Sequence, residues 1–252
     1  MNQEPEYRAM LAVDIQGSGG RGNVPQLKIR EILSSALADS FALSGIDLGA
    51  CHRDDRGDGA RVIVPRAVRK YRLIYPLMDE LAAHLRAANE LAGQKTRVRV
   101  RAALHAGDIY PDHEGGVAGI PLEVLARLLD AAPVRRALGE APPAVPVAVI
   151  MSQHFYEETV PHGYPGIDAA AFRKVRIAEK EYAADAWLHL PGSPPPPGDP
   201  EPEAAPGETP SAPAADDRAA AGHSTMINKS SGHGVIYGSQ GGPMYINHRA
   251  QS

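Results

Sequence analysis

A proline- and alanine-rich acidic tract, residues 191–223, limits how much of this 252-residue chain can form a folded core. Ten of the 23 prolines fall between Pro191 and Pro213. Proline offers no backbone N–H to a helix or sheet, and alanine and acidic side chains bury little apolar surface. We therefore expect one globular domain over residues 1–190, a disordered linker over 191–223 and a short terminal motif over 224–252.

The rest of the composition limits the partners and the compartment. The tract holds six acidic side chains and one arginine, so it accounts for the whole formal net charge of −4. The domain is close to neutral, which argues against a nucleic-acid partner. The single Cys51 excludes an internal disulfide framework. No leader-like segment and no apolar run near the roughly 20 residues needed to cross a bilayer is found, so we expect a cytoplasmic protein without a membrane partner.

Apolar periodicity within residues 1–190 predicts an α+β domain. Helical spacing marks residues 24–44, a second helix from Leu73 to Leu91 that Gly93 ends, and a third over 122–129 that Pro133 stops. Strand patterns mark residues 7–15, 46–52, 60–64, 98–104, 145–151, 172–178 and 185–190. This order favours a ferredoxin-like, largely antiparallel sheet with helices on one face.

Two aspartates at predicted strand ends form a candidate metal site. Asp14 ends the first apolar strand, and Asp58 lies between Gly57 and Gly59 in a tight hairpin turn. Carboxylates from adjacent strand ends could hold a divalent cation, and the flanking glycines leave room for a phosphate. Each aspartate also has an ordinary interpretation, because Gly-Asp-Gly is common turn chemistry and Asp14 could cap the following helix.

The glycine-rich loop after the first strand offers a competing interpretation. Residues 17–22 fit the Gly-x-Gly-x-x-Gly spacing of a dinucleotide-binding loop. In such folds the helix begins inside the glycines, so that its free N–H groups meet the pyrophosphate. Here Pro25 places the helix start after the last glycine. We therefore expect this loop to wrap a phosphate or a metal ion beside Asp14.

Taken in order, these segments resemble the class III nucleotidyl (adenylate/guanylate) cyclase homology domain. The resemblance runs from Tyr7 to about Leu190. It rests on the strand-end aspartate with its glycine, the Gly-Asp-Gly hairpin, a strand closing in His-x-Gly, a glycine-led helix, and a late hairpin with a lysine. The residues that carry it are Asp14, Ile15, Gly17, Gly57, Asp58, Gly59, His105, Gly107, Gly119, Arg127 and Lys180.

The resemblance implies a homodimer that binds a nucleoside triphosphate at the subunit interface. Asp14 and Asp58 would hold two Mg²⁺ or Mn²⁺ ions on the triphosphate, with Ile15, Gly17, Gly57 and Gly59 shaping the backbone around them. Arg127 and Lys180 would stabilise charge while the ribose 3′-oxygen attacks the α-phosphate. The ordinary interpretations are a solvated helix face for Arg127 and an exposed strand end for Lys180.

The sequence departs from the cyclase pattern around the ribose and the base. Glu123 stands where the family's helix carries a ribose-orienting asparagine, and residues 51–55 contain no base-contacting lysine. Residues 115–117 offer no counterpart of the aspartate that reads adenine. Glu123 is thus a third candidate catalytic residue, as a base or metal ligand, or a sign of lost activity. Two hypotheses stay open: a nucleotide-cyclising enzyme, and a catalytically silent nucleotide-binding or scaffold module.

The terminal motif carries a separate signal. Residues 224–248 are nearly uncharged, rich in Gly, Ser and Asn, and contain apolar clusters at 235–237 and 244–246. Such segments can stack in register as cross-β, although Pro243 interrupts the second cluster. The motif resembles bacterial amyloid signalling sequences of RIP-homotypic type. This implies recruitment by a protein with a matching motif in bacterial signalling or defence; the alternative is an adhesive tail without a partner.

Overall fold

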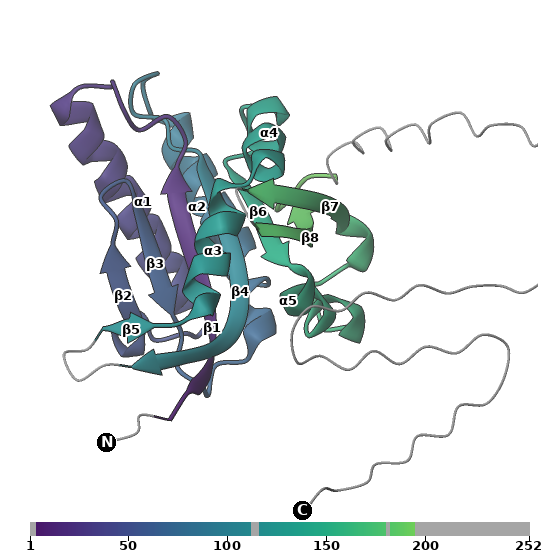
Figure 1. The fold of residues 1–252 in the computed structure, drawn as a ribbon. Coiled ribbons are helices and arrows are strands. Elements are labelled where there is room, and N and C mark those ends of the chain that lie inside the picture. The colour runs from purple at the N-terminus through teal and green to yellow at the C-terminus, as the bar shows by residue number, and fades with distance from the viewer. Residues whose placement is uncertain (1–3, 112–115, 180–181, 195–252) are drawn as a thin grey trace, which may run out of the picture. The chain divides into compact units, whose positions relative to one another are not determined.

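The computed structural model describes residues 4–111, 116–179 and 182–194 (Figure 1). Lys180, the terminal motif and all but the first four residues of the predicted linker lie outside this part of the chain. No helix in the described ranges is long and apolar enough to cross a membrane. The predicted limits of the three segments therefore stay predictions.

Eight strands form one mixed sheet in the order β2-β3-β1-β4-β6-β8-β7, with β5 paired to β4 (Figure 1). Within the described residues β4 and β6 are parallel and the other neighbouring pairs are antiparallel. The expected α+β class is confirmed. The strands are β1 (Glu6–Ile15), β2 (His52–Asp55), β3 (Gly59–Ile63), β4 (Val100–Pro111), β5 (Val117–Ala118), β6 (Val147–Ser152), β7 (Phe172–Glu179) and β8 (Tyr182–His189).

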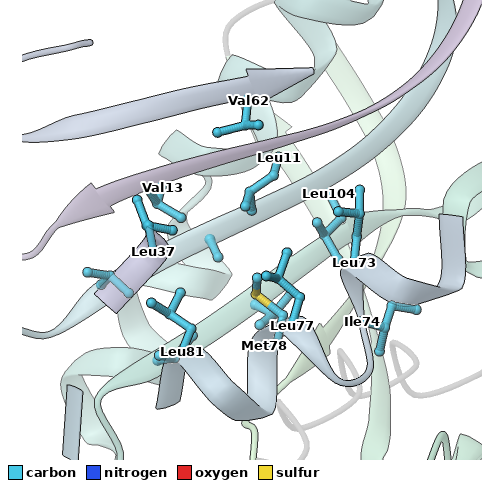
Figure 2. Close-up of a cluster of buried hydrophobic side chains, with 14 of the residues drawn as sticks. Leu11, Val13, Leu37, Val62, Leu73, Ile74, Leu77, Met78, Leu81 and Leu104 are labelled. Atoms are coloured by element: carbon cyan, nitrogen blue, oxygen red, sulfur yellow. The ribbon is translucent and has the colours of Figure 1, made fainter. Parts of the chain in front are cut away.

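One face of the sheet packs against α1 (Asn23–Leu43) and α2 (Leu77–Glu90). Side chains alternate along β1, so Leu11 and Val13 point to this face. Figure 2 shows them meeting Leu37 of α1 and Leu77 of α2 in one buried cluster. We call this side of the sheet the α1 face.

The opposite face, here called the α3 face, packs against α3 (Ile120–Asp130) and α4 (Ala132–Glu140). Met10 and Ala12 of β1 and Ile150 of β6 belong to its apolar cluster. The structure thus refines the expected arrangement, because helices lie on both faces rather than one. Both sets of alternating side chains on the central strands are apolar, so each needs a helical cover.

Pro133 was expected to stop a helix, and instead it lies in the first turn of α4. A proline is tolerated there because the first N–H groups of a helix have no partner within it. The region 46–52 also differs from the expected strand. Asp47 caps a short 3-10 turn, η1 (Leu48–Ala50), by accepting a hydrogen bond from the Gly49 amide, and β2 begins only at His52.

The remaining helical segments connect these layers. The segment expected to be one helix from Leu73 is divided in two. A 3-10 turn ends at Leu73, and α2 begins at Leu77, directly after its N-cap residue Pro76. The strand expected to end at residue 104 continues as β4 to Pro111. The short segments are η2 (Lys70–Leu73), α5 (Gln153–Glu157), η3 (Val160–His162) and η4 (Ala169–Ala171).

Candidate functional site

The structure brings Asp14 and Asp58 together at one end of β1. Asp14 pairs in register with Gly59, the residue after Asp58. The backbone N–H of Ile15 donates to the carbonyl oxygen of Asp58 at 2.9 Å. The negative charge of Asp58 contributes to raising the pKa of Asp14. Two carboxylates from neighbouring strands therefore share one region of the surface.

The hairpin that carries Asp58 is held by its own turn chemistry. Asp55 accepts a hydrogen bond from the Gly57 amide at 2.7 Å, and Gly57 adopts a left-handed backbone with φ of 83°. A Cβ at Gly59 would overlap the carbonyl oxygen of Val13 on β1. Glycine at that position lets the hairpin approach β1 closely enough to place Asp58 beside Asp14.

Arg101 of β4 forms an ion pair with Asp14, its direct partner across the β1–β4 ladder. The two side chains are only 15% and 20% exposed. Burial raises the pKa of Asp14 above its ordinary value, Arg101 opposes this rise, and Asp58 and Asp130 add to it. The sequence motifs did not connect Arg101 with the site.

The glycine loop joins the site through Ser18, which sequence reasoning also missed. The Ser18 hydroxyl donates to the Asp58 carboxylate, and Ser18 is itself buried. Arg21 holds the loop by donating to the carbonyl oxygens of Gly17, Gln16 and Arg97 at 2.6–2.7 Å. The Arg21 guanidinium is therefore occupied by backbone carbonyl oxygens. The N-cap residue of α1 is Gly22, which makes no side-chain cap hydrogen bond.

The dinucleotide interpretation of this loop is not supported by the fold. Helix α1 begins at Asn23, after the last glycine, and β1 has antiparallel neighbours on both sides among the described strands. A dinucleotide-binding βαβ unit needs a parallel neighbour. Gly17 adopts φ of 59°, and Ile15 is buried in the α1-face cluster. Both residues thus shape the backbone beside Asp14.

Charged side chains continue across the α3 face onto β2 and β3. Asp54 forms ion pairs with Arg61 and with His52, the latter at 3.2 Å. Burial raises the pKa of Asp54, but the neighbouring charges of Arg61, His52 and Arg56 outweigh burial and hold it below its ordinary value. The Nε atoms of Arg61 and Arg101 are buried without a hydrogen-bond partner in the described chain. Buried donors of this kind are uncommon, because most buried polar atoms have a hydrogen-bond partner.

Glu123 and Arg127 lie on α3, away from the contacts that join the two aspartates. Glu123 is exposed and Arg127 is partly exposed. Neither forms a hydrogen bond or ion pair with Asp14 or Asp58 in the described ranges. Asp130, at the end of the same helix, is close enough to raise the pKa of Asp14. The structure thus brings Asp14 and Asp58 together at the sheet, and it does not bring Glu123 or Arg127 of α3 into contact with them.

The His-x-Gly turn has a structural role in this fold. The Nδ1 atom of His105 lies 2.7 Å from the Ser152 hydroxyl, and burial lowers the pKa of His105 to about 4. His105 is therefore a neutral core residue at physiological pH. A Cβ at Gly107 would meet the Pro121 ring at 2.6 Å. Glycine in this motif lets α3 pack close to β4.

Comparison with known proteins identifies the fold. No protein-family model matches the sequence, and no curated protein matches it. An adenylate/guanylate cyclase/hydrolase from Silicibacter pomeroyi is similar at TM-score 0.53 and 19% identity, over 75% of this chain and 99% of that one. The non-canonical dimeric guanylyl cyclase domain of the RhoGC fusion protein from the fungus Blastocladiella emersonii has TM-score 0.51 and 10% identity, over 76% of this chain and 99% of that one. The catalytic core of a rhodopsin-guanylyl cyclase with converted specificity, in complex with ATPαS, has TM-score 0.51 and 11% identity, over 75% and 99%.

This chain has the adenylate and guanylate cyclase fold. At identities below 20% the likeness shows the fold alone. The assignment of function must therefore rest on the residues of this chain.

Within the cyclase fold, the donor set at Asp14 and Asp58 suits a hard divalent cation. Both side chains are carboxylates, and their proximity raises the pKa of Asp14, which a cation would reverse. No group of three metal-ligating side chains occurs in the described residues. A Mg²⁺ or Mn²⁺ ion here would therefore depend on substrate and water oxygens for its other ligands, and it would compete with Arg101 for Asp14.

Proposed function

We propose that this domain binds a nucleoside triphosphate on the α3 face of the sheet, with the triphosphate at Asp14 and Asp58. The observation that carries the proposal is that Asp14 pairs in register with Gly59, next to Asp58, while Arg101 of β4 forms an ion pair with Asp14. Divalent ions held by Asp14 and Asp58 would offset the negative charge of the triphosphate.

Arg101 would change partners when the ligand arrives. In the free domain its guanidinium neutralises Asp14. If Asp14 held a divalent cation, Arg101 would lose its carboxylate partner, and its guanidinium could donate to a phosphate oxygen instead. Cation binding and phosphate binding would thus support each other.

The proposed reaction is cyclisation of the nucleotide in a homodimer. The ribose 3′-oxygen attacks the α-phosphate, the bond to pyrophosphate breaks, and the hydroxyl proton leaves to solvent or substrate. Arg127 and Lys180 of one subunit would stabilise the developing charge at the aspartates of the other. The absence of a hydrogen bond or ion pair between Arg127 and the aspartates within one chain, among the described residues, supports this division of labour.

A silent nucleotide-binding module is the second candidate function. Glu123 places a negative charge on the helix from which Arg127 would act, and Asp14 is already neutralised by Arg101. In the segment 51–55, where the cyclase pattern has a lysine that contacts the nucleotide base, the Asp54 carboxylate is paired with Arg61 and with His52. These features favour binding without turnover.

The deciding experiment incubates the full-length chain with each of the four common nucleoside triphosphates and Mn²⁺. Cyclic product and pyrophosphate are measured by chromatography, and binding by calorimetry. A cyclic product that is lost in Asp58→Ala supports the enzyme. If the wild-type chain binds a nucleotide without forming product, and Asp58→Ala loses this binding, the silent module is supported. No binding of any nucleotide overturns both.

For the terminal segment we propose recruitment by a protein with a matching cross-β motif. Clustering would raise the local concentration of domains that must pair to complete a site. This proposal rests on the composition of residues 224–248, which lie outside the described part of the chain.

A further inference from the structure

A cavity of about 480 Å³ lies between α1 and the β2–β3 hairpin, on the α1 face of the sheet. Its apolar wall includes Leu33 and Leu37 of α1 and Val62 of β3; Leu37 and Val62 are labelled in Figure 2. Asp14 points to the opposite face, and neither Asp14 nor Asp58 lines the cavity. This volume falls within the roughly 300–1,000 Å³ typical of small-molecule sites. The cavity is therefore separate from the proposed nucleotide site.

The rim of the cavity carries one cation that the fold does not neutralise. Asp55 is engaged twice, with Arg30 at 3.3 Å and with the Gly57 amide at 2.7 Å. Glu31 pairs with Lys28 at 3.1 Å. Arg53 is exposed at the rim and has no hydrogen bond or ion pair with a described residue. An anionic group would find its counter-charge at Arg53.

One large apolar side chain is exposed among the charged side chains at the mouth of the cavity. Leu27 of α1 lines it and is 60% exposed, although large apolar side chains are usually buried. An apolar ligand that covered Leu27 would remove this surface from water. The ligand that fits has an apolar body and one negative charge.

We propose that this cavity binds a small anionic amphiphile of the medium-chain carboxylate class, with its chain against Leu27 and Ala60 and its carboxylate at Arg53. Such a ligand would bridge α1 and the hairpin. Gly57 and Gly59, on either side of Asp58, line the same cavity. Occupancy would thus restrain the turn that carries Asp58; this regulatory consequence rests on the proposed function, whereas the binding itself does not.

The test uses the full-length chain without nucleotide or metal and measures binding of decanoate and of decanol by calorimetry, below the concentrations at which they aggregate. Ala60→Phe fills the cavity from β3, and Ser34→Phe covers it from an exposed position of α1. We expect either change to weaken decanoate binding at least about tenfold. Arg53→Gln should weaken decanoate about tenfold and leave decanol unchanged, since only the carboxylate uses the guanidinium. Arg66→Gln, an exposed arginine outside the cavity, is the matched control and should change neither.

Absence of decanoate binding to the wild-type chain would overturn the proposal, and so would equal binding to Ser34→Phe. Ser34 is exposed on α1, so its variant reports on the cavity even if Ala60→Phe does not fold. An equal loss in Arg53→Gln and Arg66→Gln would show general charge attraction and would also overturn it. Because the assay contains no nucleotide, its result stands whether or not the domain is a cyclase.

Discussion

At the scale of single residues, the pairing of Asp14 with Arg101 decides how the site responds to charge. A largely buried carboxylate needs a counter-charge, and β4 supplies it in the free domain. A divalent cation must displace that guanidinium or share the carboxylate with it. Metal affinity and phosphate affinity are therefore linked through Arg101.

The first prediction concerns Asp58. Mn²⁺ with a nucleoside triphosphate should stabilise the folded chain by about 2.7 kcal/mol at a hundredfold excess over Kd. For a domain of this size the melting temperature should rise by roughly 5–10 °C. Asp58→Ala should remove this rise without unfolding the protein, since Asp58 lies in a turn. Equal shifts in both proteins, measured by differential scanning fluorimetry, would contradict the metal pair.

The second prediction concerns Arg101. Arg101→Met should bind Mn²⁺ alone at least about tenfold more tightly, because Asp14 loses its competing cation. The same variant should bind the nucleoside triphosphate more weakly, because a phosphate loses its guanidinium. Arg101→Lys keeps the positive charge and is the control, with Mn²⁺ affinity close to wild type. Free Mn²⁺ is followed by electron paramagnetic resonance, and unchanged affinity in Arg101→Met would show that the ion pair does not control the site.

The third prediction concerns Glu123. A carboxylate on α3 near the reacting phosphate opposes the build-up of negative charge, so Glu123→Asn should raise cyclic product formation by at least about tenfold. Product is measured with each nucleotide and Mn²⁺. A lower rate in the variant would instead give Glu123 a role of its own as a base or metal ligand.

At the scale of elements, glycine and proline affect how closely neighbouring strands and helices pack and where a helix begins. Gly59 and Gly107 permit close approach of the hairpin to β1 and of α3 to β4. Pro133 begins α4 rather than ending α3. These elements set the positions of Asp58 and Arg127, so small changes in their packing reach the site without touching it.

The fourth prediction concerns the terminal motif. A peptide of residues 224–248 should form fibrils that bind thioflavin. Val235→Asp should prevent them, because identical carboxylates stacked about 4.8 Å apart in a dry zipper repel strongly. The same substitution in the full chain should leave the melting temperature of the domain unchanged. A wild-type peptide that stays monomeric at high concentration, with no recruitment of full-length protein to seeds, would show that the tail is adhesive at most.

At the scale of the whole molecule, the proposed site would be completed by a second copy of the chain. Asp14 and Asp58 lie on the sheet and Arg127 lies on α3 without contacting them. A twofold dimer places the same two surfaces against each other twice. Each dimer would then hold two sites, both shared.

The fifth prediction tests this sharing. Asp58→Ala and Arg127→Ala should each abolish nucleotide turnover, and mixing the two variants should restore about a quarter of wild-type activity. Half of the randomly mixed dimers are mixed, and each of these has one intact site. If the domain does not turn nucleotide over, the same mixing is read by high-affinity nucleotide binding. No recovery on mixing would place Asp58 and Arg127 in one subunit's site.

The sequence by itself determined the local elements that depend on periodicity. Burial repeats every second residue in a strand and every three or four in a helix, so β1, α1 and the hairpin around Asp58 could be predicted from the pattern. The meeting of Asp14 with Asp58 also followed, since the hairpin and β1 end in carboxylates. The ordered motifs favoured the cyclase fold that the solved structures share.

Tertiary structure alone decided which charges pair. Arg101 and Asp14 are 87 residues apart, and only the β1–β4 register places them opposite each other. The register also sends Asp54 to the α3 face with Arg61, while Asp55 on the opposite side of the strand meets Arg30 of α1. Local periodicity records whether a side chain is buried and not which distant residue buries it. For that reason the proximity of Asp14 and Asp58 could be predicted from sequence, but the guanidinium partner of Asp14 and the cavity behind the hairpin could not.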